Sequence, residues 1–342
     1  MHVACIVNPH ARDGKLGKNL MKVQNELGSL GIEYEVNLTE GRGHAIEIAS
    51  NLRESKHDLI VAVGGDGTVH EVANGLRGSG KRMGIIPMGN GDDFARAIGI
   101  PLDDLRGAAS LLKTGRDYSV GAIRVEGLRA PEHPDIPPPK HYDVTGKPSR
   151  SGNLVRWALL ECDGGVTSSI NRMKDEGHFS WISGQKKYTF LAIRAILGWK
   201  SQMAWIKVND NPGRKVDLTG LFAMMQAETF GGGYKVAPGM HPFRDTASIV
   251  LGFGLSKGQM LRVMGPLEKG KHVGRWNKIT MEPCRTFEIK ALDKHGDPTD
   301  EHGHDPPLFI SLDGEISVTT PVKFEFKKNQ LLVRGGPTAP NL

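Results

Sequence analysis

The stretch Asp58-Leu59-Ile60-Val61-Ala62-Val63-Gly64-Gly65-Asp66-Gly67-Thr68 decides the fold expected for this chain. Its apolar part is a continuous run, which is typical of a strand buried on both faces of a sheet. The run stops at two glycines, and residues 68–77 then show helical spacing. A buried strand followed directly by a helix indicates a parallel α/β sheet, and such sheets bind ligands beyond the carboxyl ends of their strands.

The flanking sequence repeats this alternation before its pattern changes. Up to about residue 115, strands are expected at 3–7, 34–38 and 83–87, and helices at 16–30, 44–53, 92–98 and 105–113. Beyond it, short apolar segments typical of antiparallel strands lie at 118–125, 155–161, 203–208, 221–226, 248–253, 287–289 and 308–311. Residues 322–333 are expected to form a final strand pair around Lys327-Lys328-Asn329. The sequence therefore predicts an α/β protein with a second, mainly antiparallel domain.

The length of 342 residues also favours two domains. We expect the first at 1–117, with 318–335 returning to it, and the second at 118–317, followed by a tail at 336–342. Residues 129–151 are rich in proline, which favours extended backbone, so they are expected to form an exposed insertion.

Composition limits the classes of function. The 44 basic and 38 acidic side chains give a net charge of +6, which suits attraction to phosphates, anionic lipid or nucleic acid without choosing among them. The three cysteines, Cys5, Cys162 and Cys284, are an odd number without metal-ligand spacing, which argues against a disulfide framework or a zinc site and favours a reducing cytoplasm. No apolar run reaches the length of a membrane span, so contact with lipid is expected to be peripheral.

Three loops at predicted strand ends suggest a phosphate site. In Gly64–Thr68, small residues let backbone N–H groups approach a polyphosphate, Asp66 can hold Mg²⁺ directly or through water, and Thr68 can donate its hydroxyl. The alternative is a tight strand-to-helix turn with a capping aspartate. Residues 86–96 form a second such loop, and residues 8–15 a third polar turn. Two such loops on neighbouring strands form a nucleotide cleft, although the P-loop and Rossmann patterns are both absent.

These motifs resemble the catalytic domain of diacylglycerol kinases and sphingosine kinases. The resemblance rests on Asn8-Pro9 with Gly14-Lys15, Thr39 with Gly43, the stretch 64–75 and the loop 87–96, and it continues through the segments 231–238, 270–272 and 311–315. It implies a β-sandwich second domain and an ATP- and Mg²⁺-dependent kinase that transfers the γ-phosphoryl group to a diacylglycerol-like or sphingosine-like hydroxyl.

The same resemblance assigns individual residues. The implied ATP contacts are Asn8, Pro9, His10, Ala11, Arg12, Thr39, Gly65, Asp66, Gly67, Thr68, Val69, His70, Glu71 and Asn90. The implied catalytic residues are Glu315 and Asp313 of the Asp-Gly-Glu motif together with Asp66. Glu315 is expected to be the general base and Asp66 the metal and phosphate organiser, although sphingosine kinases often give the base role to the aspartate of the glycine loop. The implied metal ligands are Asp66 and Asp245.

Three departures from the family pattern bear on metal use. Asp92 stands where an asparagine is usual, Ser119 where an aspartate is common, and Asp245 is followed by threonine instead of glycine. Two other functions also stay open. One is a kinase of a soluble substrate, similar to NAD kinases, and the other is a catalytically silent nucleotide or lipid sensor.

The expected partner is a lipid substrate at a membrane surface. No nucleic-acid partner is expected, and a homodimer is left open. The resemblance predicts a cytoplasmic, peripherally membrane-associated enzyme whose active site lies between the two domains. The stretch 186–215 interleaves seven basic residues with Trp199 and Trp205, so it is the expected membrane contact, the alternative being an ordinary charged face over a strand pair.

Overall fold

The computed structural model describes residues 1–11, 15–129, 147–148, 153–179, 181–182 and 185–337. Most of the expected insertion, together with Arg12 and the last five residues, lies outside this description. The chain divides into two compact units. Unit 1 comprises Met1–Ala122, His241–Asp245 and Lys328–Leu342, and unit 2 comprises Ile123–Met240 and Thr246–Lys327.

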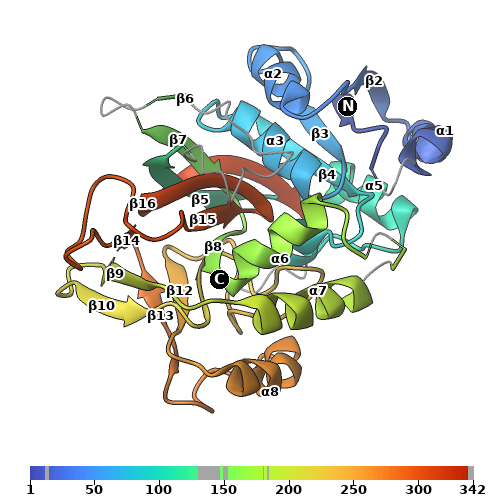
Figure 1. Ribbon diagram of the computed structural model, residues 1–342. Coiled ribbons are helices and arrows are strands. Elements are labelled where there is room, and N and C mark those ends of the chain that lie inside the picture. Colours follow the sequence, from blue (N-terminus) through green and yellow to red (C-terminus); the bar gives the residue numbers. More distant parts are fainter. Residues whose placement is uncertain (12–14, 130–146, 149–152, 180, 183–184, 338–342) are drawn as a thin grey trace. The chain divides into compact units, whose positions relative to one another are not determined.

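Unit 1 is built on a parallel sheet, as the sequence predicted. Its strand order is β2-β1-β3-β4, and the end of β16 pairs with β4 in the same direction through Leu332 and Val333. The strands are β1 (His2–Val7), β2 (Glu33–Leu38), β3 (Leu59–Gly64), β4 (Arg82–Pro87) and β16 (Glu315–Gly335). Every residue of β3 is buried, which explains its uninterrupted apolar sequence (Figure 1).

Helices cover this sheet. They are α1 (Lys15–Ser29), α2 (His44–Asn51), α3 (Asp66–Leu76), α4 (Asp93–Ala97) and α5 (Leu105–Thr114). Alternate residues of β1 and β3 pack with side chains from α1 and α5 in one apolar cluster. Helices α2 and α3 cross closely at Gly75, where an added Cβ would lie 2.5 Å from that of Ala49. Glycine at this position therefore allows the two helices to pack this closely.

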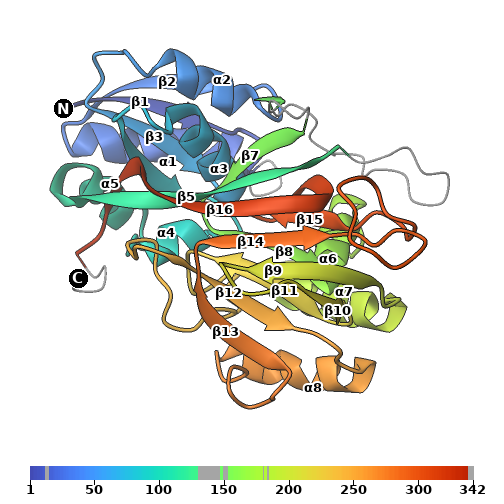
Figure 2. The ribbon, with the colours of Figure 1, turned by 90° about the vertical axis from the view of Figure 1, so that its left-hand side faces the viewer.

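Unit 2 contains two antiparallel sheets that share β16 and can be followed in Figure 2. One has the order β13-β12-β11-β8-β15-β16, and the other runs β10-β9-β14-β16-β5-β7-β6. Their further strands are β5 (Arg116–Leu128), β6 (Lys147–Pro148), β7 (Leu154–Ala158), β8 (Glu161–Gly165), β9 (Met203–Val208), β10 (Arg214–Asp217), β11 (Leu221–Met225), β12 (Ala247–Gly252), β13 (Ile279–Cys284), β14 (Thr286–Lys290) and β15 (Phe309–Leu312).

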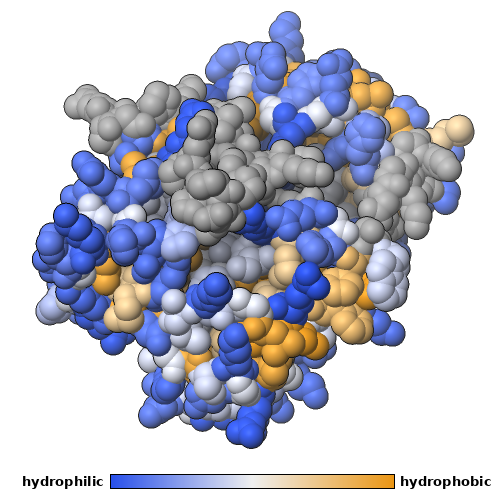
Figure 3. Space-filling view, in the orientation of Figure 1, coloured by the Kyte–Doolittle hydropathy of each residue, from blue (hydrophilic) through white to orange (hydrophobic). Residues whose placement is uncertain are grey.

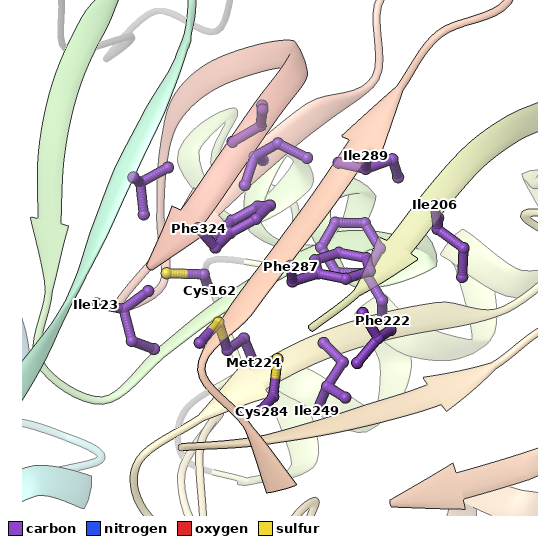
Figure 4. Packing of buried hydrophobic residues seen from close by; sticks show 14 of the residues in the cluster. Ile123, Cys162, Ile206, Phe222, Met224, Ile249, Cys284, Phe287, Ile289 and Phe324 are labelled. Carbon is purple, nitrogen blue, oxygen red and sulfur yellow. The ribbon is translucent and has the colours of Figure 1, made fainter. Parts of the chain in front are cut away.

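Aromatic side chains fill the space between these sheets. Phe287 of β14 lies with its ring centroid 5.1 Å from that of Phe222 and 5.5 Å from that of Phe324, and all three rings are fully buried (Figure 4). Such tilted aromatic pairs add to the stabilisation that burial gives. The predicted fold, a parallel α/β domain followed by a mainly antiparallel sandwich, is confirmed.

Three local predictions were wrong. Residues 322–333 are part of one 21-residue strand, β16, although Asn329 adopts the positive φ typical of a turn. Residues 155–161 contain the end of β7 and the start of β8, separated by Leu159 and Leu160. The described part of unit 2 also contains the helices α6 (Val166–Asp175), α7 (Gln185–Gly198) and α8 (Lys257–Glu268), and the prediction omitted α6 and α8. In the described part of the chain, no helix is both long and apolar enough to cross a membrane.

Replacing Phe222 by alanine should lower the free energy of unfolding by about 3–5 kcal/mol, because truncating a buried aromatic ring leaves a cavity in a close-packed core. Phe190→Ala is the matched control, since this ring is 48% exposed. Urea denaturation measures both effects. Equal losses in the two variants would show that the Phe222 ring does not hold the two sheets together.

Candidate active site

The loops that follow β3 and β4 touch each other at their glycines. A Cβ added to Gly89 would lie 2.5 Å from the Cα of Gly65, and one added to Gly64 would lie 2.4 Å from the hydroxyl oxygen of Thr68. A side chain at Gly89 would therefore push the two loops apart, whereas one at Gly64 would collide with the Thr68 side chain of its own loop. Gly65 and Gly89 are explained first by the close approach of backbone to backbone, and Gly64 by the space that Thr68 occupies.

Asp66 links the same two loops through its carboxylate. Its Oδ1 accepts a hydrogen bond of 3.1 Å from the backbone N–H of Phe94, in the first turn of α4. Burial, together with the nearby carboxylates of Asp93 and Asp92, raises the pKa of Asp66 to about 7. The aspartate of the glycine motif thus stabilises a helix start and is held in a site with excess negative charge.

Asp92, one of the three departures from the family pattern, has a structural role in this loop. It adopts a left-handed backbone conformation with φ 49°, and each of its carboxylate oxygens lies 3.0 Å from the backbone nitrogen of Gly89. The adjacent Asp93 forms an ion pair with Arg96, whose guanidinium also donates to the carbonyl of Gly91. The extra carboxylate is therefore used to close the turn.

Glu71 lies on α3 and caps the neighbouring helix α2. Its two carboxylate oxygens accept hydrogen bonds of 2.9 and 3.1 Å from the backbone N–H groups of Gly43 and Ala45. Gly43 precedes the first residue of α2 with φ 82°, a conformation that glycine adopts without strain. This motif residue satisfies helix donors that have no partner within α2.

The remaining implied nucleotide contacts also follow strand ends of unit 1 or lie on α3. Asn8 follows β1, and its side-chain oxygen accepts from the N–H of His10, which folds the Asn8–Ala11 turn. Thr39 follows β2 and is buried, whereas Asn90 is exposed after β4. Gly67, Val69 and His70 belong to the first turns of α3, next to Thr68. The described residues of this implied set, including Pro9 and Gly65, thus lie around the carboxyl edge of one parallel sheet.

The two implied metal ligands differ in their surroundings. The side chain of Asp245 is 82% exposed and forms an ion pair of 2.6 Å with Lys328. Over the described ranges, no group of three or more His, Cys, Asp or Glu side chains could hold a metal. Mg²⁺ in nucleotide sites typically uses one or two carboxylates plus the substrate phosphates, and the negatively charged surroundings of Asp66 fit that mode of binding.

In unit 2, the Asp313-Gly314 pair forms the turn that joins β15 to β16. The two residues have φ values of 50° and 82°, as in a two-residue hairpin of the primed type. The carboxylate of Asp313 accepts hydrogen bonds of 2.7 to 3.1 Å from the backbone N–H groups of Leu159, Leu160 and Glu161. Asp313 therefore organises backbone, and Glu315 is the first residue beyond the turn.

Sequence reasoning missed two carboxylates beside this turn. Glu161 and Asp163 are 1% and 0% exposed, and they lie two residues apart on β8, so both face the same side of its sheet. Glu161 accepts a hydrogen bond of 2.9 Å from the N–H of Gly314. The available signal was the pair of acids in Glu161-Cys162-Asp163, at the end of a predicted buried strand.

An apolar cavity of about 90 Å³ lies in unit 2, among α6, α7, α8 and the sheet strands β11 and β12. Its walls come from residues such as Val166, Ile196, Val263 and Met264, and the polar side chains on them are those of Thr167 and His272. Walls of this composition favour apolar ligands.

Replacing Glu71 by alanine should lower the free energy of unfolding by about 1–2 kcal/mol, because two N–H groups at the start of α2 lose their acceptor. Glu71→Gln keeps one acceptor oxygen and should lose less. Urea denaturation without nucleotide measures both. Unchanged stability combined with weaker nucleotide binding would instead make Glu71 a ligand residue alone.

Comparisons with known proteins agree with this organisation. Residues 2–125 match the diacylglycerol kinase catalytic domain, and residues 162–334 match the YegS C-terminal NAD kinase beta sandwich-like domain. The chain is 37% identical over 122 residues to a diacylglycerol kinase of Bacillus subtilis, covering 34% of this chain and 40% of that protein. It is 38% identical over 108 residues to the "Probable lipid kinase YegS-like" of Klebsiella pneumoniae, covering 31% and 36%.

The fold is shared over a greater length than the detectable sequence similarity. The crystal structure of a diacylglycerol kinase from Bacillus anthracis superimposes with a TM-score of 0.66 at 19% identity, covering 99% of this chain and 98% of that one. Because the second domain model alone matches half of the sequence, and the first accounts for the N-terminal third, this chain belongs to the diacylglycerol kinase and YegS-like family.

Proposed function

We propose that this chain is an ATP-dependent lipid kinase that transfers the γ-phosphoryl group of ATP to a lipid hydroxyl of diacylglycerol or sphingosine type. The observation that carries the proposal is the apolar cavity of unit 2, the unit that also carries Glu315. A soluble phosphate acceptor needs polar groups to orient it, whereas these walls suit a hydrocarbon chain.

Unit 1 supplies the nucleotide side of the reaction in this proposal. The turns after β1, β2, β3 and β4 lie at the carboxyl edge of the sheet, where α/β proteins bind ligands. Asp66 is the residue that would hold Mg²⁺ together with the phosphates. When bound, this ion would neutralise charge that develops on the transferring phosphoryl group.

Glu315 acts as the general base of the proposed reaction. As the lipid oxygen forms its bond to the γ-phosphorus, the bond from that phosphorus to the bridging oxygen breaks and ADP leaves. The hydroxyl proton passes to the Glu315 carboxylate. Asp313 holds the preceding turn through backbone N–H groups, so it contributes position to this step.

One observation favours a second candidate, a kinase of a soluble substrate. The family model that matches residues 162–334 is described as NAD kinase beta sandwich-like. The lack of polar residues other than Thr167 and His272 on the described cavity walls weighs against a dinucleotide there.

Labelled ATP and a panel of acceptors would test the proposal by thin-layer chromatography of the products. The panel contains diacylglycerol, sphingosine, ceramide, an ether lipid and NAD. We expect label in one lipid product and none in NADP. Label in NADP alone would replace the lipid kinase by the second candidate, and label in no product would support a silent sensor.

Glu315→Gln should lower kcat at least about 100-fold, because general base catalysis commonly contributes that much, while ATP affinity stays nearly unchanged. Asp66→Asn is the contrasting variant, because it should weaken both Mg²⁺-ATP binding and turnover. Steady-state kinetics and calorimetric titration with ATP separate the two effects. Near wild-type turnover in Glu315→Gln would remove Glu315 from the base role.

We also propose that α7 carries the membrane contact of this enzyme. Phe190 and Leu197 of α7 are 48% and 56% exposed, and Lys186 is exposed beside them. Figure 3 shows apolar surface over α7 and α8 with polar residues around it. Trp199, which the sequence suggested for this role, packs inward and donates its indole N–H to the carbonyl of Leu218. Exposed apolar side chains next to basic ones suit an anionic bilayer surface.

Reversing the charges of Lys186 and Lys187 to glutamate should weaken binding to vesicles of anionic phospholipid, and rising salt should weaken binding of the wild type, because exposed charges are screened within about 10 Å at 0.1 M salt. Lys22→Glu with Lys56→Glu is the matched control, since both lysines are exposed and belong to unit 1. Co-sedimentation measures binding. Equal losses of vesicle binding in the two double variants would show that binding depends on the net charge of the protein and not on α7.

A further inference from the structure

The Asp313-Gly314 turn is held on both sides of Gly314. The N–H of Gly314 donates to Glu161 at 2.9 Å, and its carbonyl accepts from the ammonium of Lys174 on α6 at 2.9 Å. In addition, the N–H of Asp313 donates to the carbonyl of Glu161. The side chain of Glu161 is therefore one of the direct supports of the turn that precedes Glu315.

Behind Glu161 lies Asp163, whose carboxylate is fully buried. In the described part of unit 2, neither its oxygens nor Oε2 of Glu161 has a hydrogen bond of standard geometry. The carboxyl group of Glu161 and the hydroxyls of Thr167 and Ser311 nevertheless lie within reach of Asp163. Ser311 is its direct neighbour on β15 and is fixed by a bond of 2.7 Å from Asn171.

The carboxyl groups of Glu161, Asp163 and Asp313 would carry an excess of negative charge if all three were ionised. Asp313 is matched by backbone N–H groups, and Lys174 is the cation that acts on Asp163. Two further buried anions next to one another would repel. Among the described residues, they also belong to no group of three or more His, Cys, Asp or Glu side chains that could hold a metal ion between them. A proton on one of the two acids removes the repulsion and supplies the missing donor.

We propose that Glu161 and Asp163 share one proton, carried mainly by Glu161, and that this acid pair is a positioning element that fixes the Asp313-Gly314 turn and thereby Glu315. Oε2 of Glu161 donates to Asp163, and Oε1 accepts from Gly314. The catalytic consequence rests on the proposed lipid kinase function, whereas the shared proton does not.

The electrostatics agree with this geometry. Burial first, and then the carboxylates of Asp163 and Asp313, raise the pKa of Glu161 well above its ordinary value of 4.5. Burial also raises the pKa of Asp163 to about 6, while Thr167, Glu161, Ser311 and Lys174 act to lower it. The neighbouring Cys162 points to the opposite face of the sheet, into the apolar core shown in Figure 4.

The sign of the pH dependence follows from these directions. A carboxyl group with a raised pKa in the folded state contributes stability that is complete below its ordinary pKa and is lost as pH rises toward the raised value. The free energy of unfolding of the wild type should therefore decline above about pH 4.5 through this pair. Glu161→Gln should lack that decline, because a neutral amide replaces the shared proton.

Infrared difference spectroscopy tests the proton without any need for kinase activity. The wild type minus Glu161→Gln difference at neutral pH should contain the stretching band of a protonated carboxyl group. Glu176→Gln is the matched control, because this glutamate is exposed at the end of α6 and pairs with Arg172, and it should give no such band. A missing band for Glu161→Gln would overturn the proposal.

Kinetics tests the positioning role. Glu161→Ala should lower kcat about 100-fold with little change in the KM for ATP, since a displacement of about 1 Å costs that much. Glu161→Gln should recover most of the loss. We expect kcat of the wild type to fall at alkaline pH as the pair deprotonates, and Glu161→Gln should lack this fall. A Gln variant as impaired as the Ala variant, or one with the same alkaline fall, would contradict the positioning role.

The two proposals fail in distinguishable ways. If the wild type phosphorylates no lipid, the proposed function fails, but the infrared band and the pH dependence of stability still test the acid pair. If Glu161→Ala does not fold, the pH profile of kcat in Glu161→Gln still tests the positioning role, because the glutamine keeps a donor and an acceptor in place.

Discussion

Backbone N–H groups at helix starts and in tight turns need acceptors, and in this chain the carboxylates of the signature motifs supply them. Glu71 accepts from N–H groups at the start of α2, and Asp66 accepts from one in the first turn of α4. Asp92 accepts from an N–H group in the loop after β4, and Asp313 accepts from three N–H groups at the start of β8. Buried donors without partners are costly, so these acids fix the loops before any ligand binds. The motifs therefore encode loop geometry as well as chemistry.

This constraint explains why the local sequence predicted unit 1 well but did not predict the buried acids beside the Asp313-Gly314 turn. The strands of unit 1 are continuous apolar runs whose ends carry glycines and acids, so sequence order is sufficient to locate the carboxyl edge. The role of Glu161 depends instead on a turn about 150 residues later, which reaches it only after β8 and β15 pair. No periodicity within residues 155–165 contains that information.

The errors in unit 2 have similar physical causes. Lys327-Lys328-Asn329 has the composition of a turn, and Asn329 does adopt positive φ, but pairing on both sides of it keeps β16 continuous. Helix α8 contains Gly258, Gly265 and Pro266, which weaken a helical prediction. Its signal was the capping box between Ser256 and Gln259, a motif that fixes a helix start independently of apolar periodicity.

Buried acids with raised pKa values occur in both units, and their surroundings suggest two different uses. Asp66 lies in loops at the carboxyl edge of a sheet, where, in the proposed function, Mg²⁺ bound to a nucleotide would offset its charge. Glu161 and Asp163 are enclosed by α6, β11 and β15, where a proton is the cation that fits. A buried anion pair would strain the turn beside it. In the proposed mechanism, protonation of this pair would therefore hold Glu315 in a fixed geometry, and the Glu315 carboxylate itself would accept the substrate proton.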